Sequence, residues 1–477
     1  MAPLGALVFG RWSGRKVKRY GYDQTHARLI RSRRAVRNDE AGGACVSGGP
    51  CARLIMPFPD SLGHAWRPVS RRNETHMSRI DRAINIDDLR RMAKRRLPKI
   101  MFDFIEGGVE DEVGLRTNAH AFRDLRLVPR YYVDTAKREQ KATLFGRAYA
   151  SPFGIAPTGM AGAFRRDAEL YLAQGAAEAD VPYLMSGAAN ASMEQAAKLA
   201  PKNLWYQIYG ARNRDVAADL VKRAIDCGVT ALAVTCDVPV ASNRERNRRN
   251  GFVRPLRMTL PTILEAMLHP AWVLNYYRSG GLPMLENWQP YAAKDATPDD
   301  VAGLFASQTP DPSQVWGDLE AIRRAWPGTL LLKGVMHPED ARLALGMGVD
   351  GLIVSNHGGR QLDMMPSPLE MLPMIRAAVG PDVPLLLDSG VRRGSDIVAA
   401  LCLGADFVLT GRATLYGATA GGLEGVKKAV SILQREIDLV MGQLGAVNLE
   451  ALGPRFLLDT VRAEEERRNT GAMGGRR

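Results

Sequence analysis

A histidine and an arginine lie three residues apart, directly after a short apolar run. Residues 352–354 read Leu-Ile-Val, and His357 and Arg360 follow with a Gly-Gly pair between them. Such a run is typical of a buried parallel strand. An imidazole can accept a proton near neutral pH while a guanidinium holds an anion, which suits proton removal from an anionic substrate. A lone His-x-x-Arg is more often structural, but its position after a predicted barrel strand favours catalysis.

Length and composition fit a soluble globular protein. The 477 residues are 46% hydrophobic and 24% charged, enough for one large α/β barrel or for two to three smaller domains. No apolar run reaches 18 residues, so a transmembrane helix is not expected. The five cysteines are scattered without metal-ligand or disulfide spacing, which favours a reducing compartment and predicts no metal site.

The basic charge is concentrated at the N-terminus. Residues 1–76 hold 14 Lys/Arg and 5 Asp/Glu, which accounts for +9 of the net +13. The remainder is nearly neutral, so we expect no nucleic-acid partner. Segment 1–76 is rich in Arg, Gly, Ser and Pro, and we expect a disordered leader, either a targeting peptide or sequence upstream of a true start at Met77. Residues 77–455 would form the folded domain and 456–477 a charged tail.

The folded part alternates short apolar runs with helix-length amphipathic segments. Eight runs are strand candidates: 153–156, 183–185, 204–208, 231–235, 330–333, 352–354, 385–387 and 407–409. This pattern predicts a (β/α)8 TIM barrel. A doubly wound open sheet is the alternative, but it calls for a glycine fingerprint after the first strand that Ala156-Pro157-Thr158-Gly159 does not supply. Two short helices, from Ile86 and over 100–105, are predicted before the barrel.

A long insertion separates the fourth and fifth strands. About 90 residues lie between Asp237 and Leu330, far more than an ordinary connection. Within 254–299, residues 258–277 concentrate large apolar side chains around Trp272, Tyr276 and Tyr277, while prolines interrupt the helix. Segment 255–290 could lie on a membrane surface without crossing it, or it could pack on the barrel or a neighbouring subunit.

Polar or glycine residues close nearly every predicted strand, as a barrel active site requires. They are Thr158, Gly159, Ser186, Gln207, Tyr209, Thr235, Asp237, Lys333, His357, Arg360, Asp388, Gly411 and Arg412. The last two loops, 388–394 and 410–412, combine glycines with arginines. Loops at these positions of barrels commonly hold a phosphate, so a phosphorylated ligand or cofactor is expected.

Residues 355–363, S-N-H-G-G-R-Q-L-D, resemble the signature of the FMN-dependent 2-hydroxy-acid dehydrogenases and oxidases, a family that includes L-lactate and mandelate dehydrogenases. The resemblance runs from about Ile86 to Leu452. Through Leu268-His269-Pro270 and residues 411–417 the chain is most similar to the membrane-associated (S)-mandelate dehydrogenase branch.

The resemblance implies FMN as cofactor and assigns catalytic roles. His357 would be the base and Asp237 its partner. Arg360 and Arg244 would hold the substrate carboxylate, with Tyr209 bonded to the substrate.

The resemblance also assigns the residues around FMN. Lys333 would lie near N1 and the C2 oxygen of the flavin. Residues around the flavin ring would be Pro157, Thr158, Gly159, Ser186, Gln207, Thr235 and Ser355. Those around the ribityl chain and phosphate would be Asp388, Gly390, Arg392, Gly411 and Arg412.

Two residues depart from the family pattern. Phe104 stands where relatives have a tyrosine that contacts the substrate carboxylate, and losing that hydrogen bond costs about 0.5–1.5 kcal/mol or more. Ala188 stands where short-chain oxidases carry a tryptophan, which leaves room for a larger substrate. Gly159, where oxidases often have alanine, agrees with a dehydrogenase.

The resulting prediction is FMN-dependent oxidation of an (S)-2-hydroxy acid to the 2-oxo acid, with electrons passed to a membrane quinone or another acceptor. A hydrogen-peroxide-producing oxidase, a non-catalytic flavin carrier and a Schiff-base aldolase using Lys333 are the alternatives. The resemblance further implies a homo-tetramer located in the cytoplasm, peripheral on the inner face of the cytoplasmic membrane.

Overall fold

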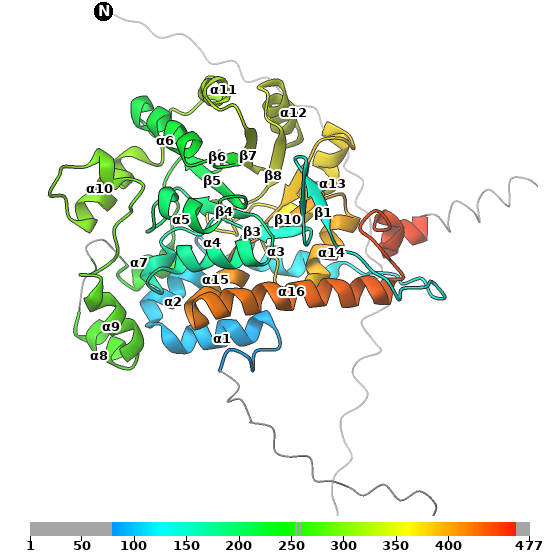
Figure 1. Ribbon diagram of the computed structural model, residues 1–477, viewed down its shortest axis with the longest axis horizontal. Coiled ribbons are helices and arrows are strands. Elements are labelled where there is room, and N and C mark those ends of the chain that lie inside the picture. Colours follow the sequence, from blue (N-terminus) through cyan, green and yellow to red (C-terminus); the bar gives the residue numbers. More distant parts are fainter. Residues whose placement is uncertain (1–78, 253–255, 257–258, 464–477) are drawn as a thin grey trace, which may run out of the picture. The chain divides into compact units, whose positions relative to one another are not determined.

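Eight parallel strands close into a barrel in the order β10-β3-β4-β5-β6-β7-β8-β9 (Figure 1). The predicted barrel is therefore confirmed, and the open doubly wound sheet is wrong. The barrel strands are β3 Phe153–Ile155, β4 Tyr183–Ser186, β5 Leu204–Tyr209, β6 Ala231–Thr235, β7 Thr329–Val335, β8 Gly351–Val354, β9 Leu385–Leu387 and β10 Phe407–Thr410. The protein is described here from a computed structural model, which describes residues 79–252, 256 and 259–463. The predicted leader 1–76 and most of the tail lie outside these residues.

Helices surround the strands, as alternation of strand and helix requires. They are α4 Ala168–Glu178, α5 Met193–Leu199, α6 Arg214–Asp226, α11 Trp316–Ala325, α12 Pro338–Gly346, α13 Pro368–Val379, α14 Gly394–Cys402 and α15 Arg412–Gly421. The long α16, Leu423–Leu444, packs against α15, α14 and α4. Leu352, Ile353 and Val354 of β8 are fully buried, which explains why the strands read as continuous apolar runs.

Three helices precede the barrel within the described residues. They are α1 Ile86–Arg96, α2 Lys99–Glu106 and α3 Val113–Asp124. Helix α1 begins where the Asn85 side chain accepts a hydrogen bond from the Asp88 amide at 2.9 Å. Pro98 separates α1 from α2, and Gly107 ends α2. Both predicted helices are thus confirmed, and α1 packs along α15.

A hairpin closes the amino-terminal end of the barrel. Strands β1 Ala142–Leu144 and β2 Arg147–Tyr149 pair antiparallel. Tyr149 packs edge-on against Trp205 and Phe407, with ring centroids 6.4 and 5.8 Å apart. The sequence analysis missed this hairpin because each strand has only three residues and lacks an apolar run.

The insertion after β6 is helical. It contains α7 Glu245–Arg249, α8 Leu260–Met267, α9 Pro270–Arg278, the 3₁₀ turn η3 Gln289–Tyr291 and α10 Pro298–Gln308. Helices α8 and α9 lie beside α2 and α7 at the edge of the view in Figure 1. The Glu265 carboxylate of α8 accepts from the Lys99 amide at 2.6 Å, which ties the insertion to α2. The described residues also form two further 3₁₀ turns, η2 Ala161–Ala163 and η4 Pro454–Phe456.

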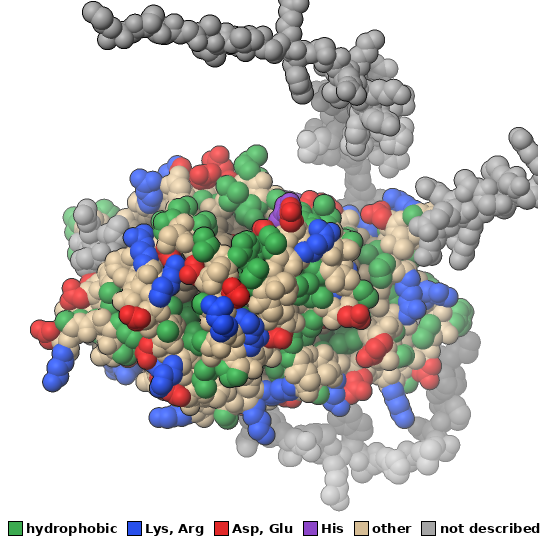
Figure 2. Space-filling view, turned by 90° about the horizontal axis from the view of Figure 1, so that it is seen from above, with side chains coloured by type: hydrophobic (Ala, Val, Ile, Leu, Met, Phe, Trp, Pro, Cys, Tyr) green, Lys and Arg blue, Asp and Glu red, His purple; other side chains and the backbone are tan. Residues whose placement is uncertain are grey.

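The described surface carries mixed charge. Figure 2 shows acidic and basic side chains interspersed with apolar ones on one face, without a continuous basic stripe. Among the described residues, no helix combines the length and apolarity that crossing a bilayer demands.

Candidate active site

A cavity of about 530 Å³ opens at the carboxyl ends of the barrel strands. It is lined by seventeen predicted site residues, namely Phe104, Pro157, Thr158, Gly159, Ala188, Gln207, Tyr209, Thr235, Arg244, Lys333, His357, Arg360, Asp388, Gly390, Arg392, Gly411 and Arg412. The other three, Ser186, Asp237 and Ser355, are hydrogen-bonded to lining residues and lie behind them. The predicted positions therefore converge on one site, at the end of the barrel where catalytic residues concentrate.

His357 and Asp237 form a hydrogen-bonded pair at the cavity wall. The His357 Nδ1 atom lies 3.0 Å from Asp237 Oδ1, and the Asp237 side chain is only 6% exposed. Removal from water lowers the pKa of His357, although Asp237 opposes that shift. Burial alone would raise the pKa of Asp237, but His357 and Lys333 lower it overall. The pair therefore combines a neutral imidazole with an ionised carboxylate, as a general base requires.

The loop that carries His357 has a constrained backbone. His357, Gly358 and Gly359 all have positive φ, at 57°, 69° and 73°. A side chain at Gly359 would lie 2.5 Å from the backbone nitrogen of Leu115, so only glycine fits there. The loop is also held by Asn356, whose amide exchanges two hydrogen bonds with Asn118 of α3, at 2.7 and 2.8 Å. This backbone directs the imidazole into the cavity.

Arg244 and Arg360 supply positive charge beside His357. The Arg244 Nη2 atom donates to the Gln361 side chain at 3.1 Å, and Gln361 in turn donates to the Asp237 carbonyl oxygen at 3.2 Å. Neither arginine forms an ion pair within the described residues. Removal from water, and then the mutual repulsion with Arg244 and Arg412, lowers the pKa of Arg360. Uncompensated cations at this wall favour an anionic ligand.

The last turn of α2 orients two of these arginines. Arg360 Nη1 donates to the carbonyl oxygens of Phe104 and Gly107, both at 2.8 Å. Arg412 donates to the carbonyls of Ile105 and Gly107, at 2.8 and 3.0 Å. Carbonyls at a helix end lack partners within the helix and accept cations well. Because these acceptors are neutral, they fix the arginines without cancelling their charge.

Lys333 lies at the back of the cavity in an ion pair. Its ammonium is 3.0 Å from Asp388 Oδ2 and donates to Ser355 Oγ at 2.8 Å. Burial alone would lower the pKa of Lys333, but Asp388 and Asp237 raise it overall. A Schiff-base nucleophile needs a neutral amine, so this geometry disfavours the aldolase alternative.

The residues expected around a flavin ring form a buried hydrogen-bonded chain. Gln207 Nε2 donates to Thr235 Oγ1 at 2.8 Å, and the Ser186 hydroxyl donates to Gln207 Oε1 at 3.3 Å. The buried hydroxyl of Thr158 has no partner among the described residues. A buried group of this kind normally has a partner, and a bound heterocycle would supply one.

The cavity is also cationic around Arg392 and Arg412, which are expected to hold a phosphate. Arg392 donates to the Val391 carbonyl oxygen at 2.8 Å and its guanidinium lies 5.8 Å from the ring centroid of Tyr416. Burial, and then Arg392, lowers the pKa of Arg412 to about 10. Arg392 forms no ion pair with any described residue, so its positive charge is available to bind a phosphate. A ligand with an uncharged ring, a polar chain and an anionic end, such as FMN, fits this set of groups.

Apolar side chains line the remaining wall. The Phe104 ring lies 4.5 Å from Phe252 and 6.0 Å from Phe164, centroid to centroid, and the Arg360 guanidinium stacks 5.1 Å from its centroid. Phe305 of α10 lines the cavity as well. The sequence analysis missed Phe252, Phe305 and the bridging Gln361. The position of Gln361 within the signature at residues 355–363 could have indicated a place in the site. Nothing in the sequence indicates that Phe305 lines the cavity.

The geometry agrees with comparisons against known proteins. The family model described as FMN-dependent dehydrogenase matches residues 93–459. (S)-mandelate dehydrogenase from Pseudomonas putida is 39% identical over 373 residues, which are 78% of this chain and 93% of that protein. L-lactate dehydrogenase from Pseudomonas syringae pv. syringae (strain B728a) is 37% identical over 374 residues, covering 78% of this chain and 98% of that protein.

Solved structures show the same similarity. The monotopic membrane protein (S)-mandelate dehydrogenase superposes with a TM-score of 0.76 at 40% identity, covering 79% of this chain and 99% of that chain. A mandelate oxidase with (S)-4-hydroxymandelic acid superposes with a TM-score of 0.67 at 33% identity, covering 77% and 97%.

Proposed function

Because the chain belongs to the family of FMN-dependent dehydrogenases, we propose that it oxidises an (S)-2-hydroxy acid with a bulky or aromatic side chain to the 2-oxo acid. The observation that carries the proposal is the His357–Asp237 pair, 3.0 Å apart, beside Arg244 and Arg360, which lack carboxylate partners among the described residues. This arrangement provides a base and an anion-binding wall in one cavity.

Each side chain has a defined task in this reaction. Arg244 and Arg360 hold the substrate carboxylate. Since Nδ1 of His357 bonds to Asp237, Nε2 is the nitrogen left to take a proton from the substrate, either from its α-carbon or from its hydroxyl. Asp237 then stabilises the imidazolium. When bound, FMN supplies the two-electron acceptor, and the charged Lys333 at the back of the cavity favours its anionic reduced form.

The size of the substrate side chain follows from Ala188 and Phe104, which line the cavity. Ala188 contributes only a methyl group, and Phe104 lacks the hydroxyl of the tyrosine that relatives are expected to carry at this position. An aromatic substituent would bury apolar surface here, worth on the order of 25 cal/mol per Å². The aromatic cluster of Phe104, Phe164 and Phe252 offers ring faces and edges for such a contact.

We further propose that the enzyme lies on a membrane surface and passes electrons to quinone. Helices α8 and α9 expose Leu260, Met267, Leu268 and Tyr277 at 70%, 68%, 76% and 72%. Such a concentration of exposed apolar side chains marks an interaction site. We define Leu260, Ile263, Leu264, Met267, Leu268, Leu274 and Tyr277 as the apolar patch.

Two features of the predicted membrane segment need correction. Trp272, expected at the interface, is 2% exposed and its indole nitrogen donates to the Ala163 carbonyl oxygen at 2.9 Å. Residues 282–288 belong to the protein interior rather than to a surface segment, since Leu282, Leu285 and Trp288 are buried. The contact region therefore narrows to the exposed faces of α8 and α9. Four arginines just upstream of the segment would suit contact with anionic lipid headgroups, and two of these four, Arg254 and Arg257, lie outside the described residues.

A hydrogen-peroxide-producing oxidase is the second candidate, supported by the similarity to a mandelate oxidase. The cytoplasmic location on the inner membrane face and the homo-oligomeric assembly stay predictions. Oxidation of the hydroxy acid is the same first half-reaction whether quinone or oxygen accepts the electrons. The acceptor is therefore tested separately, by comparing turnover with a short-chain quinone and with oxygen.

Anaerobic reduction of the bound flavin tests the proposal. The purified holoenzyme is mixed with (S)-mandelate, L-lactate, glycolate and a long-chain 2-hydroxy acid, and flavin absorbance is followed. We expect the fastest bleaching with mandelate or the long-chain acid. Faster bleaching by glycolate would contradict the proposed pocket, and no bleaching by any of the acids would contradict the reaction.

A further inference from the structure

The last turn of α2 touches both ends of the active site. Its carbonyl oxygens accept hydrogen bonds from Arg360, at the end expected to bind the substrate carboxylate, and from Arg412, at the end expected to bind the FMN phosphate. Arg412 also donates to the Gly358 carbonyl oxygen, next to His357, at 3.0 Å. A shift of this turn would therefore move two cationic groups and the loop of the base together.

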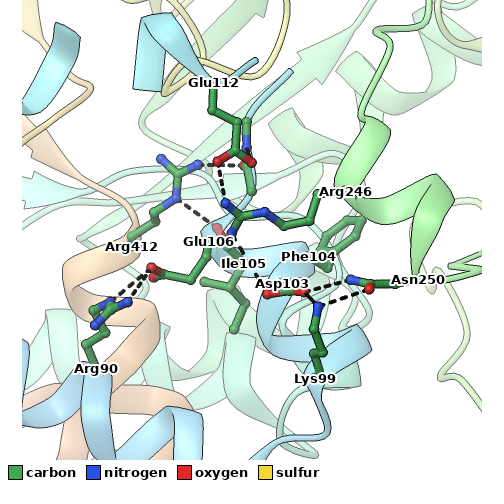
Figure 3. A network of polar contacts seen from close by, with 12 residues as sticks. Arg90, Lys99, Asp103, Phe104, Ile105, Glu106, Glu112, Arg246, Asn250 and Arg412 are labelled. Atoms are coloured by element: carbon green, nitrogen blue, oxygen red, sulfur yellow. Dashed lines mark hydrogen bonds and ion pairs between the residues drawn. The ribbon is translucent and has the colours of Figure 1, made fainter. Parts of the chain in front are cut away.

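Glu106, the final residue of α2, ties this turn to its surroundings. Its carboxylate accepts from Arg90 of α1 at 2.9 Å and from the hydroxyl of Tyr416 on α15. Figure 3 shows Glu106 directed toward Arg90, while Asp103 points away on the other side of α2 toward Lys99 and Asn250. The Glu106 side chain is 17% exposed, so these contacts are shielded from solvent. Burial alone would raise the pKa of Glu106, but Arg90 and Tyr416 lower it overall, which keeps the carboxylate ionised.

Tyr416 completes a closed set of contacts. It lies on α15 four residues after Arg412, and residues at this spacing occupy one face of a helix. Arg412 donates hydrogen bonds to carbonyl oxygens at the end of α2, and Tyr416 donates one to the Glu106 carboxylate. Helix α15 is therefore hydrogen-bonded to the end of α2 at two points. The Tyr416 ring also lies beneath Arg392 at the phosphate end.

We propose that Glu106 and Tyr416 are positioning residues that hold the FMN-phosphate arginines and the substrate-carboxylate arginine in one fixed arrangement. Neither residue lines the cavity or is needed to move a proton. Their function is to fix the last turn of α2, and through it the groups that bind the two anions. The inference rests on the proposed function for its substrate half and on the family's cofactor for its FMN half.

Two substitutions test the inference. Glu106→Gln keeps the shape and removes the charge, and Tyr416→Phe removes only the hydroxyl. A hydrogen bond to a charged group contributes enough for about a 10-fold effect. For Glu106→Gln we expect the substrate KM and the FMN dissociation constant each to rise about 10-fold, with the flavin reduction rate at saturating substrate within about 2-fold of wild type. Tyr416→Phe should move both constants in the same direction by about 3-fold.

A matched control separates positioning from general stability. Arg138 and Asp438 form a second arginine–carboxylate pair, which is bidentate at 2.7 and 2.9 Å and remote from the cavity lining. Asp438→Asn should lower the melting temperature without moving KM or FMN affinity. FMN release is followed by flavin fluorescence on dilution of each holoenzyme.

Three outcomes would overturn the inference. They are a lower melting temperature with unchanged KM and FMN affinity, a change in only one of the two constants, and a loss of flavin reduction rate at saturation. If Glu106→Gln fails to fold, Tyr416→Phe, which keeps the Arg90–Glu106 pair, decides alone. If no 2-hydroxy acid reduces the wild-type flavin, the proposed function has failed, and the FMN measurement still tests the FMN half of the positioning role.

Discussion

Arg360 and Arg412 donate to the same acceptor, the carbonyl oxygen of Gly107, at 2.8 and 3.0 Å. Two guanidinium groups repel each other, and removal from water lowers the pKa of both. A shared neutral acceptor keeps them close without satisfying their charge. The site thus has strong positive potential before any ligand binds, and the binding of two anions relieves the repulsion.

Replacement of the base should stop the chemistry without releasing the cofactor. His357→Ala removes the imidazole but leaves the arginines and Lys333 in place. Loss of a general base costs about 10²–10⁴-fold. We expect that reduction in the rate of anaerobic flavin reduction, with FMN content equal to wild type. Near-normal turnover of this variant would remove His357 from the role of base.

The pH profile should report the His357–Asp237 pair. The base must be neutral to act, so activity falls as pH drops through its pKa. Since burial lowers the pKa of His357, the acid limb of kcat/KM should lie below the ordinary histidine value.

Removing the Asp237 carboxylate should shift the acid limb of the kcat/KM profile to lower pH. Asp237 opposes the lowering, so Asp237→Asn should shift the limb to still lower pH while reducing kcat. Glu245→Gln on helix α7, a half-buried carboxylate that pairs with Arg249 and does not contact His357, serves as the control. An acid limb that stays in place in Asp237→Asn would show that another group titrates.

Substrate preference should change when the open wall is filled. Ala188→Trp would place an indole where a large substrate side chain is expected to lie. We expect kcat/KM for mandelate to fall at least about 10-fold relative to glycolate, because the indole would occupy the volume that the phenyl group needs and overpacking that volume is costly. Equal losses for both acids would indicate that position 188 does not face the substrate side chain.

Membrane attachment should depend on the apolar patch rather than on the whole insertion. Deleting 255–290 would remove Trp288, whose indole donates to the Gly187 carbonyl oxygen at 2.9 Å beside the active site. Leu264→Ser combined with Leu268→Ser changes only exposed positions. We expect this variant to lose binding to anionic vesicles while flavin reduction by substrate stays within about 2-fold.

An exposed leucine outside the apolar patch provides the control for this variant. Leu439 is also exposed but lies on α16, so Leu439→Ser should bind vesicles like wild type. Full retention of Leu264→Ser/Leu268→Ser on vesicles, or no binding by wild type, would contradict the membrane proposal.

The barrel could be predicted because its signals are local. Every strand of the barrel is buried on both faces, so each appears as an apolar run, as at 352–354, and polar residues mark where it ends. The predicted boundaries differ from the observed ones by one or two residues, as for β7, which begins at Thr329 rather than at Leu330. The signature around His357 then identified the mouth of the barrel.

The contacts that position the site could not be predicted in this way. Glu106 and Tyr416 are 310 residues apart, and neither neighbourhood marks the other as a partner. Phe305 reaches the cavity from an insertion whose path the sequence does not specify. Trp272 looks like an interfacial residue by composition, yet its indole has a partner inside the protein. Composition describes a segment, whereas burial depends on what the rest of the chain places against it.

The hairpin β1–β2 affects how substrate, product and electron acceptor enter and leave the active site. With Leu144 and Tyr149 sealing the amino-terminal end, the cavity is reached from the opposite rim. In the part of the chain that the structure describes, the hydroxy acid, its keto product and the electron acceptor would then all use this one opening. Departure of the first product would precede arrival of the second reactant, and double-reciprocal plots at several acceptor concentrations should run parallel.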